Sequence, residues 1–299
     1  DRRHRRHGPE VGVCEEGLAI EACATANRRA ASGNSWRQAC ADVSLINLFF
    51  TFSQLFPDAA NMKISDPSAG QICDEYELIA AELPLANAQV LELGCGKAEK
   101  TRAVAQKVAA IVALEVDAIQ HALNLRIADL PNVSFRQGAA EEIPAVDCSF
   151  DIVMMFKSLH HVPTSGMDRA LSEIRRVLKP GGLAWISEPV YAGEFNEILR
   201  LFHDEKEVRE AAFGTVRRAV DDGRFKLVGQ RFFSTPGHFD SFAQFEERVI
   251  RVTHTDHRLA PELHAAVRRK FETYLTATGA DFRNPLRVDI LRKPPDGHG

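Results

Sequence analysis

The chain has 299 residues, enough to bury one large α/β core or two smaller ones. Its 45% hydrophobic and 26% charged residues are ordinary for a globular domain. The net charge of -4 lacks the basic excess of a nucleic-acid-binding protein. The apolar run Leu45–Phe56 is too short for a membrane span and is interrupted by polar residues. We therefore expect no nucleic-acid partner and no membrane association, while the oligomeric state is not indicated.

The six cysteines show no metal-binding or disulfide pattern. No two of them form a CxxC pair, and their spacing suggests neither a zinc site nor a disulfide framework. No apolar segment of the kind found in signal peptides follows the Arg/His-rich start. These features predict reduced thiols, no metal site and a cytoplasmic protein.

Residues 1–61 differ in composition from the rest of the chain. They contain arginine but no lysine, and the first methionine is Met62. One interpretation is an atypical N-terminal extension with an amphipathic helix around Val43–Phe56. The other is an artefactual stretch ahead of a natural start at Met62. Both remain open, and the functional domain is predicted over residues 62–299.

From residue 62 onward, short apolar runs alternate with helical patterns, which is typical of a parallel sheet built from βαβ units. The first five strands are predicted at Gln89–Leu93, Ala110–Val116, Val133–Gln137, Phe150–Phe156 and Leu183–Ser187, with a turn at Lys179–Gly182 before the fifth. Two later strands are predicted at Phe225–Phe233 and Leu286–Leu291. Helices are predicted at Glu99–Val108, Ala118–Leu130, Met167–Leu178, Ser241–Arg251 and Pro261–Thr278, with further helical material over Glu194–Asp222.

The first predicted strand runs into a glycine turn formed by Gly94 and Gly96. Such a turn lets the backbone approach a ligand closely and directs free helix N–H groups at it. Glu115 ends the second strand about 20 residues later, where an acid can accept both hydroxyls of a ribose. The segment 138–144 then follows the third strand, where a purine ring would lie. These features indicate a site for an adenosine-containing cofactor.

Two glutamates favour a methyl donor over a nicotinamide dinucleotide. The dinucleotide fingerprint needs a third glycine at the position of Glu99, where a carboxylate would crowd the helix and oppose the pyrophosphate. Glu92, two residues before Gly94, suits an ammonium group better than a phosphate. S-adenosylmethionine carries an amino-acid end and no phosphate. A nucleotide-binding oxidoreductase remains the alternative function.

Five segments in order resemble the class I S-adenosylmethionine-dependent methyltransferases, in their small-molecule-type branch. They are VLELGCGKA, IVALEVD, VSFRQGAAEEIP, CSFDIVMMFKSLHHV and RALSEIRRVLKPGGLAWISEP, at residues 90–98, 111–117, 133–144, 148–162 and 169–189. The resemblance implies a doubly wound, mostly parallel seven-stranded sheet of the Rossmann-like methyltransferase fold, with helical additions. It places the cofactor core at about residues 89–188 and the substrate-side helices and last strands at 194–291.

The resemblance also assigns the cofactor-binding residues. Glu92 would hold the methionine amino group, the turn Gly94, Cys95 and Gly96 would line its carboxylate and the ribose, Glu115 would bind the ribose diol, and Ala140 and Glu141 would flank the adenine. Val116 is a further cofactor-binding candidate, and Phe156, with Tyr191, is a candidate aromatic contact of the sulfonium. Two positions depart from the family pattern. Ala98 replaces a frequent glycine, which is acceptable if its φ stays negative, and Ala139 replaces a frequent acid. A non-catalytic protein using this fold is therefore a further alternative.

The substrate side is predicted at the carboxyl ends of the fourth and fifth strands. Methyl transfer needs alignment of the reactants, and a base only where the acceptor must lose a proton. We take His160 and His161 as the catalytic candidates, and Lys157, Glu188 and Tyr191 as substrate contacts. Adjacent histidines rarely direct both rings at one metal, so no metal site is predicted there. The acceptor is expected to be a small molecule, and neither its identity nor the methylated atom can be predicted.

Overall fold

The computed structural model describes residues 59–66, 71–252 and 257–295, all within one unit that spans residues 55–299. The predictions for residues 1–58, including the helix at Val43–Phe56, lie outside the described residues. Among the residues described, we find no helix with both the length and the apolar character that crossing a bilayer requires.

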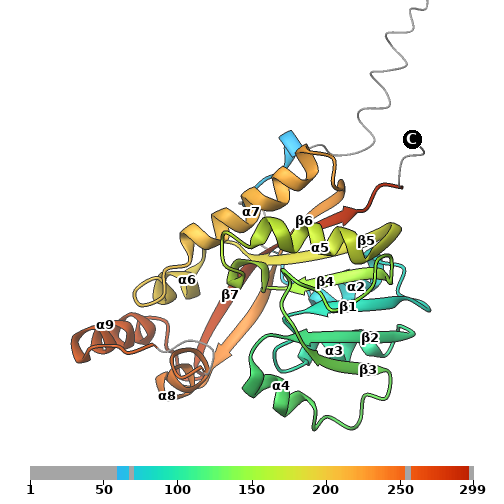
Figure 1. The fold of residues 1–299 in the computed structure, drawn as a ribbon. Helices are drawn as coiled ribbons and strands as arrows, with labels where there is room; N and C mark the ends of the chain where they lie inside the picture. Colours follow the sequence, from blue (N-terminus) through green and yellow to red (C-terminus); the bar gives the residue numbers. More distant parts are fainter. Residues whose placement is uncertain (1–58, 67–70, 253–256, 296–299) are drawn as a thin grey trace, which may run out of the picture. The chain divides into compact units, whose positions relative to one another are not determined.

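A seven-stranded sheet forms the centre of this unit, with strand order β3-β2-β1-β4-β5-β7-β6 (Figure 1). Strands β1 to β5 pair in parallel, and β7 is antiparallel to both β5 and β6. The structure therefore confirms the predicted mostly parallel α/β fold. The strands are β1 (Gln89–Leu93), β2 (Ala110–Glu115), β3 (Val133–Gln137), β4 (Phe150–Phe156), β5 (Leu178–Pro189), β6 (Lys226–Phe239) and β7 (Ala280–Arg292).

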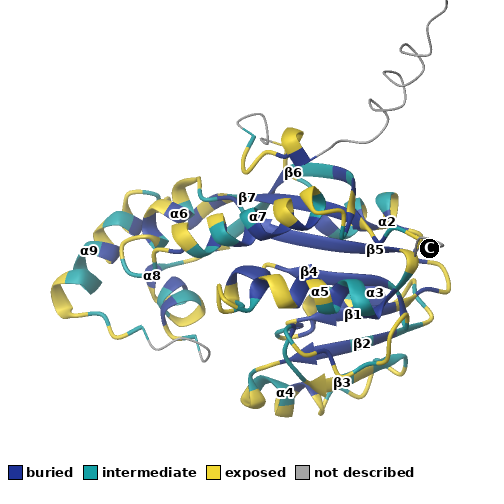
Figure 2. Ribbon diagram, turned by 45° about the horizontal axis from the view of Figure 1, so that its top comes forward, coloured by how far each residue is buried: buried dark blue, intermediate teal, exposed yellow. Residues whose placement is uncertain are grey.

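Helices cover both faces of the sheet. Buried residues of α5 and α7 pack on one face, and those of α2 and α3 pack on the other. Figure 2 shows the strands as the most buried layer between partly exposed helices. The described helical segments are η2 (Ala59–Asn61), α2 (Glu75–Glu82), α3 (Glu99–Ala105), α4 (Ala118–Asn124), η3 (Leu159–His161), α5 (Met167–Val177), α6 (Glu194–Leu199), α7 (Lys206–Asp221), α8 (Phe242–Phe245), η4 (Glu246–Ile250) and α9 (Pro261–Glu272).

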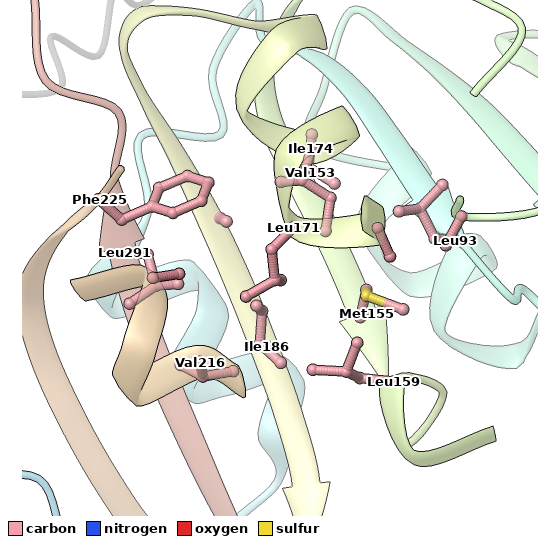
Figure 3. Packing of buried hydrophobic residues seen from close by; sticks show 14 of the residues in the cluster. Leu93, Val153, Met155, Leu159, Leu171, Ile174, Ile186, Val216, Phe225 and Leu291 are labelled. Carbon is pink, nitrogen blue, oxygen red and sulfur yellow. The ribbon is translucent and has the colours of Figure 1, made fainter. Parts of the chain in front are cut away.

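The apolar stripe of α5 shows why this helix packs on the sheet. Leu171 and Ile174 lie one turn apart on the same helix face, and both are fully buried against β4 and β5 (Figure 3). Val153 and Ile186 are their neighbours on the strands in the same cluster. Burial of each such side chain stabilises the fold by about 1.5–3 kcal/mol. The packing fixes the ends of β4 and β5, where the candidate substrate residues lie.

Some element bounds differ from the sequence predictions. The predicted turn Lys179–Gly182 lies inside β5, because β7 and the residue after it extend far enough to pair there: the Gly181 N–H donates to the Lys293 carbonyl at 3.0 Å. Helix α4 ends at Asn124 and not at Leu130. Helix α9 likewise ends at Glu272, before the predicted Thr278.

Strands β6 and β7 are longer than predicted because their distal halves pair with each other beyond the sheet. This extension carries α8 and α9, and Figure 1 shows α6, α8 and α9 gathered around its far end. A separate apolar cluster holds these helices together. Its core is rich in phenylalanine, with Phe239, Phe242, Phe245, Phe271 and Phe282 all buried. We call this part the cap.

Candidate functional site

The turn after β1 needs glycine at position 94 for two reasons. Gly94 has φ +73°, in the left-handed region. A Cβ there would also lie 2.8 Å from the Cβ of Ser158, whose hydroxyl donates to the Leu93 carbonyl at 2.8 Å. The N–H groups of Gly94 and Cys95 both donate to the Leu114 carbonyl, at 2.9 and 3.0 Å. Through the hydrogen bond from Ser158 to Leu93, the turns after β1 and β4 are in direct contact.

Ala98 adopts φ +62°, so the condition under which alanine would be acceptable here, a negative φ, is not met. The tight turn, closed by the Ala98 N–H donating to the Cys95 carbonyl at 2.9 Å, requires the left-handed region at this position. For an L-residue this conformation costs about 1–2 kcal/mol. The turn is thus formed with a strained alanine at a position that favours glycine.

The Ala98→Gly variant is expected to raise the free energy of unfolding by up to about 1 kcal/mol, because relief of strain exceeds the added flexibility of the unfolded chain. Urea denaturation measures the change. Ala103→Gly in the middle of α3 serves as the control and should lose up to about 1 kcal/mol. An equal loss of stability in both variants would show that Ala98 is not strained.

Glu115 is buried at the end of β2 and anchors the glycine turn. Its Oε2 accepts the Gly96 N–H at 2.7 Å, and its Oε1 accepts the Asp117 N–H at 2.9 Å. Each carboxylate oxygen has two acceptor positions, so one on each oxygen is left for hydroxyl groups. Asn124 holds the other side of the turn, donating to the Gly96 carbonyl at 2.8 Å. Sequence reasoning missed Asn124, because nothing in a single sequence marks one helical asparagine as buried.

Glu92 is a buried carboxyl with an incomplete set of counterions. Burial raises its pKa to about 7, and the nearby Glu115 adds to the shift. Lys100 opposes the shift, but its ammonium pairs with another buried acid, Glu75, at 3.3 Å. A ligand ammonium would supply the missing positive charge. This observation fits an amino-acid end at Glu92 and does not fit a phosphate.

The predicted adenine-side residues lie beside Glu115. The Gly138 N–H donates to the Glu115 carbonyl at 3.2 Å, which brings the loop with Ala140 and Glu141 next to the ribose position. Ala140 is buried and Glu141 half-buried, while the Val116 side chain is 66% exposed. Val116 therefore offers an exposed apolar surface against which a planar ring could stack.

Cys95 packs inside the turn. Burial raises the pKa of its thiol to about 12, so the thiol stays protonated near neutral pH. A protonated, buried thiol is a poor nucleophile. The structure thus gives Cys95 a packing role within the predicted cofactor turn.

His160 is held by a buried glutamate from the neighbouring strand. Its Nδ1 lies 2.6 Å from Oε2 of Glu188, and Oε1 of Glu188 accepts the Leu159 N–H at 2.9 Å. His160 is 5% exposed and Glu188 only 1%. Glu188, predicted to contact substrate, instead orients His160 from behind.

A cavity of about 540 Å³ lies at the carboxyl ends of β4 and β5. Phe156, Lys157, His160 and His161 line it from the β4 end and η3, and the cap closes the other side with side chains that include Phe195. The structure therefore brings together four of the predicted site residues. Tyr191 is not among the lining residues, although both of its chain neighbours are.

Lys157 is exposed and has φ +53°, while its N–H donates to the Ser187 carbonyl at 2.7 Å. A left-handed non-glycine residue stores strain, and such residues gather at functional sites. The hydrogen bond to β5 fixes this conformation and places Lys157 at the cavity. Its position agrees with the predicted role as a substrate contact.

A polar cluster from the start of α7 forms a wall that sequence reasoning missed. Glu205 and Arg209 are both buried and form an ion pair one helical turn apart. Arg209 also donates to Asn196 Oδ1 at 3.0 Å, and His203 Nε2 lies 3.1 Å from Glu205 Oε1. Burial alone would raise the pKa of Glu205, but the Arg209 guanidinium, together with His160 and His203 when these are protonated, holds it below the usual value. Glu205 is therefore ionised.

Comparison with known proteins shows which family this site resembles. The model of the methyltransferase domain family matches residues 90–182, which contain the glycine turn, Glu92, Glu115 and η3. Residues 90–182 are thus similar in sequence to the class I S-adenosylmethionine-dependent methyltransferases. The sequence resemblance is thereby confirmed.

Relatives of the methyltransferase domain include an uncharacterised methyltransferase from Synechocystis, 35% identical over 108 residues that cover 34% of this chain and 50% of the relative. An uncharacterised methyltransferase from Mycobacterium tuberculosis is 36% identical over 119 residues, 39% of this chain and 47% of the relative. The chain thus spans about half the length of these curated relatives.

The crystal structure of YcgJ from Bacillus subtilis is similar in fold to the methyltransferase domain and its flanking elements. It has a TM-score of 0.52 and 17% sequence identity, and covers 74% of this chain and 98% of its own. At this identity the similarity concerns the fold alone. It supports the Rossmann-like architecture of the described unit.

Proposed function

We propose that the chain transfers a methyl group from S-adenosylmethionine to a small-molecule acceptor. The observation that carries this proposal is the continuity of the cofactor turn with the cavity. Ser158 contacts the glycine turn through its hydrogen bond to Leu93, and residues on both sides of Ser158 line the cavity. The chain from Phe156 to His161 therefore borders both sites. Donor and acceptor would meet at this segment.

The buried carboxylates and the glycine turn fit the proposed cofactor. Glu92 would hold its ammonium group, the turn Gly94–Gly96 would lie along its amino-acid end, and Glu115 would accept its ribose hydroxyls. When bound, the cofactor supplies an electrophilic methyl group on a positively charged sulfur. The chain's own contribution is alignment and the exclusion of water.

The cavity suits a small acceptor with an apolar body. Its volume of about 540 Å³ lies within the range of small-molecule sites, about 300–1,000 Å³. Phe156, Phe195 and Phe239 provide apolar walls, while His160 and Lys157 provide polar contacts. Glu205, Arg209 and Arg248 also line the cavity, so a small acceptor that carries polar groups beside its apolar body fits it best. We assign His160 and His161 to the acceptor side of the site.

Methyl transfer can be tested by incubating the full chain with methyl-labelled S-adenosylmethionine and a fractionated metabolite extract. We expect label in one small-molecule fraction. Ala192→Trp should abolish transfer without weakening cofactor binding, because Ala192 is exposed and lines the cavity. Ala192→Ser is the matched control and should keep activity. Cofactor binding without any labelled product, in extracts of varied origin, would contradict catalysis and favour a binding protein with this fold.

The Glu115→Ala variant is expected to weaken binding of S-adenosylhomocysteine by about 1–3 kcal/mol, or about 5- to 150-fold, because ribose hydroxyls and two backbone N–H groups lose their acceptor. Isothermal titration calorimetry measures the change. Glu142→Ala removes an exposed carboxylate from the same region and should bind as the wild type does. An unchanged dissociation constant for Glu115→Ala would remove this residue from the cofactor site.

A further inference from the structure

Two histidines and a glutamate gather at one wall of the acceptor cavity. The potential ligand atoms of His160, His161 and Glu205 all lie within 4.8 Å of one another. The histidines belong to η3, and Glu205 immediately precedes α7, which packs against η3. Adjacent histidines on a strand would point to opposite faces. In this short helical turn their ring centroids are 4.1 Å apart.

The contacts of His160 leave one nitrogen available as a ligand. An ionised Glu188 only accepts hydrogen bonds, so the neutral tautomer of His160 that fits this contact carries its proton on Nδ1. Nε2 then presents its lone pair to Oε1 of Glu205, 3.6 Å away. This distance is too long for a hydrogen bond. It matches the separation of about 3.4 Å between two donors bound at about 2.1 Å to one tetrahedral ion.

The carboxylate of Glu205 is oriented for the same purpose. Arg209 pairs with Oε2, while Oε1 faces His160 Nε2 at 3.6 Å and lies 3.1 Å from Nε2 of His203. A carboxylate oxygen has two acceptor positions, so one on Oε1 is left for an ion. Arg209 is itself fixed by Asn196 at 3.0 Å, so the carboxylate cannot turn without breaking a buried ion pair. Carboxylates that hold a ligating histidine, as Glu188 does, are a regular feature of metal sites. Both ligands are therefore positioned before any ion arrives.

We propose that His160 Nε2, His161 and Glu205 Oε1 bind one divalent first-row transition-metal ion, such as Zn²⁺. Imidazole and carboxylate ligands suit such ions, and three protein ligands leave a coordination position open. The open position faces the cavity, which these residues line. The site departs from the sequence prediction of no metal. Metal binding at this site does not depend on the proposed methyl transfer. Only the coordination of a methyl acceptor to the bound ion rests on that function.

The test is metal binding by the full chain without an affinity tag, after treatment with a chelator. Titration with Zn²⁺ and Co²⁺, followed by calorimetry and elemental analysis, should show one equivalent of bound ion. His161→Ala and Glu205→Gln should each weaken binding at least tenfold, a fall of about the size seen when metal-site contacts are lost. His161 is exposed, so its variant should fold even where loss of Glu205 destabilises the chain.

His238→Ala is the matched control, because His238 is an exposed histidine paired with Asp281 and Asp240 at 2.7 and 3.1 Å. Its metal affinity should equal that of the wild type. The proposal is overturned if the wild type binds no stoichiometric ion, or if His161→Ala and Glu205→Gln retain wild-type affinity. Binding of S-adenosylhomocysteine should survive the chelator, so failure of the metal site and failure of the proposed function are distinguishable.

Discussion

Glu92→Gln is expected to weaken binding of S-adenosylhomocysteine by about 3 kcal/mol, on the order of a hundredfold, because a buried ammonium would lose its counter-charge. Glutamine has the size of glutamate and no charge, so the turn should keep its shape. Calorimetry at pH 8, above the pKa of about 7, compares the two proteins where Glu92 is ionised. Equal affinities there would show that Glu92 does not meet the ammonium group.

The raised pKa of Glu92 also predicts how the stability of the ligand-free chain changes with pH. Burial raises the pKa of Glu92 from 4.5 to about 7, so the folded chain binds more protons than the unfolded chain between these values. Stability in the absence of ligand should therefore fall as pH rises from about 4.5 to about 7, by up to about 3 kcal/mol, and then level off. The Glu92→Gln variant should not show this loss of stability, and at pH 8 it should be at least as stable as the wild type.

Ligand binding should follow the opposite trend. A ligand ammonium favours ionised Glu92, so wild-type affinity should rise with pH up to about 7 and then become constant. The difference in ligand affinity between the wild type and Glu92→Gln at each pH separates the contribution of Glu92 from that of other titrating residues. A wild-type affinity that falls as pH rises to 7, relative to the variant, would contradict the assignment.

Asp289→Ala is expected to lower the free energy of unfolding by about 3–5 kcal/mol, because it leaves a buried guanidinium without its counter-charge. Asp289 is fully buried on β7, and its Oδ2 accepts from Nε of Arg287 at 2.9 Å. Gln230 on β6 donates to its other oxygen at 2.7 Å. Arg287 is 2% exposed and lies over the Phe213 ring at 4.6 Å, so it cannot reach water without disrupting α7 packing.

Urea denaturation of Asp289→Ala should be compared with that of Asp281→Ala on the same strand. Asp281 is exposed and pairs with the exposed His238. Such surface pairs contribute about 0–1 kcal/mol. The two variants should therefore differ by at least about 2 kcal/mol. Similar small losses in both would mean that the buried pair adds no more than a surface pair.

The parts of the fold that sequence reasoning predicted are those set by local pattern. Gln89–Leu93 and Phe150–Phe156 are short apolar runs bounded by turn residues, which is what a strand buried on both faces requires. The glycine turn and Glu115 followed from spacing along the chain. His160 could be placed at the carboxyl end of β4 for the same reason.

The parts that were missed depend on contacts between distant segments. The extensions of β6 and β7 pair with each other, and this pairing is not visible in either segment alone. Glu205 immediately precedes α7 and Arg209 lies four residues later within it, a spacing that ordinarily indicates an exposed ion pair. They are buried here at the cavity, beneath the cap. The positive φ of Ala98 could not be inferred because alanine prefers the opposite sign.

The most direct test of the account is calorimetry on the full chain with S-adenosylhomocysteine and, separately, NADH. The buried Glu92, the glycine turn and Glu115 predict saturable one-to-one binding of S-adenosylhomocysteine and no binding of NADH. Binding of NADH without binding of S-adenosylhomocysteine would contradict the proposed cofactor and, with it, the proposed methyl transfer.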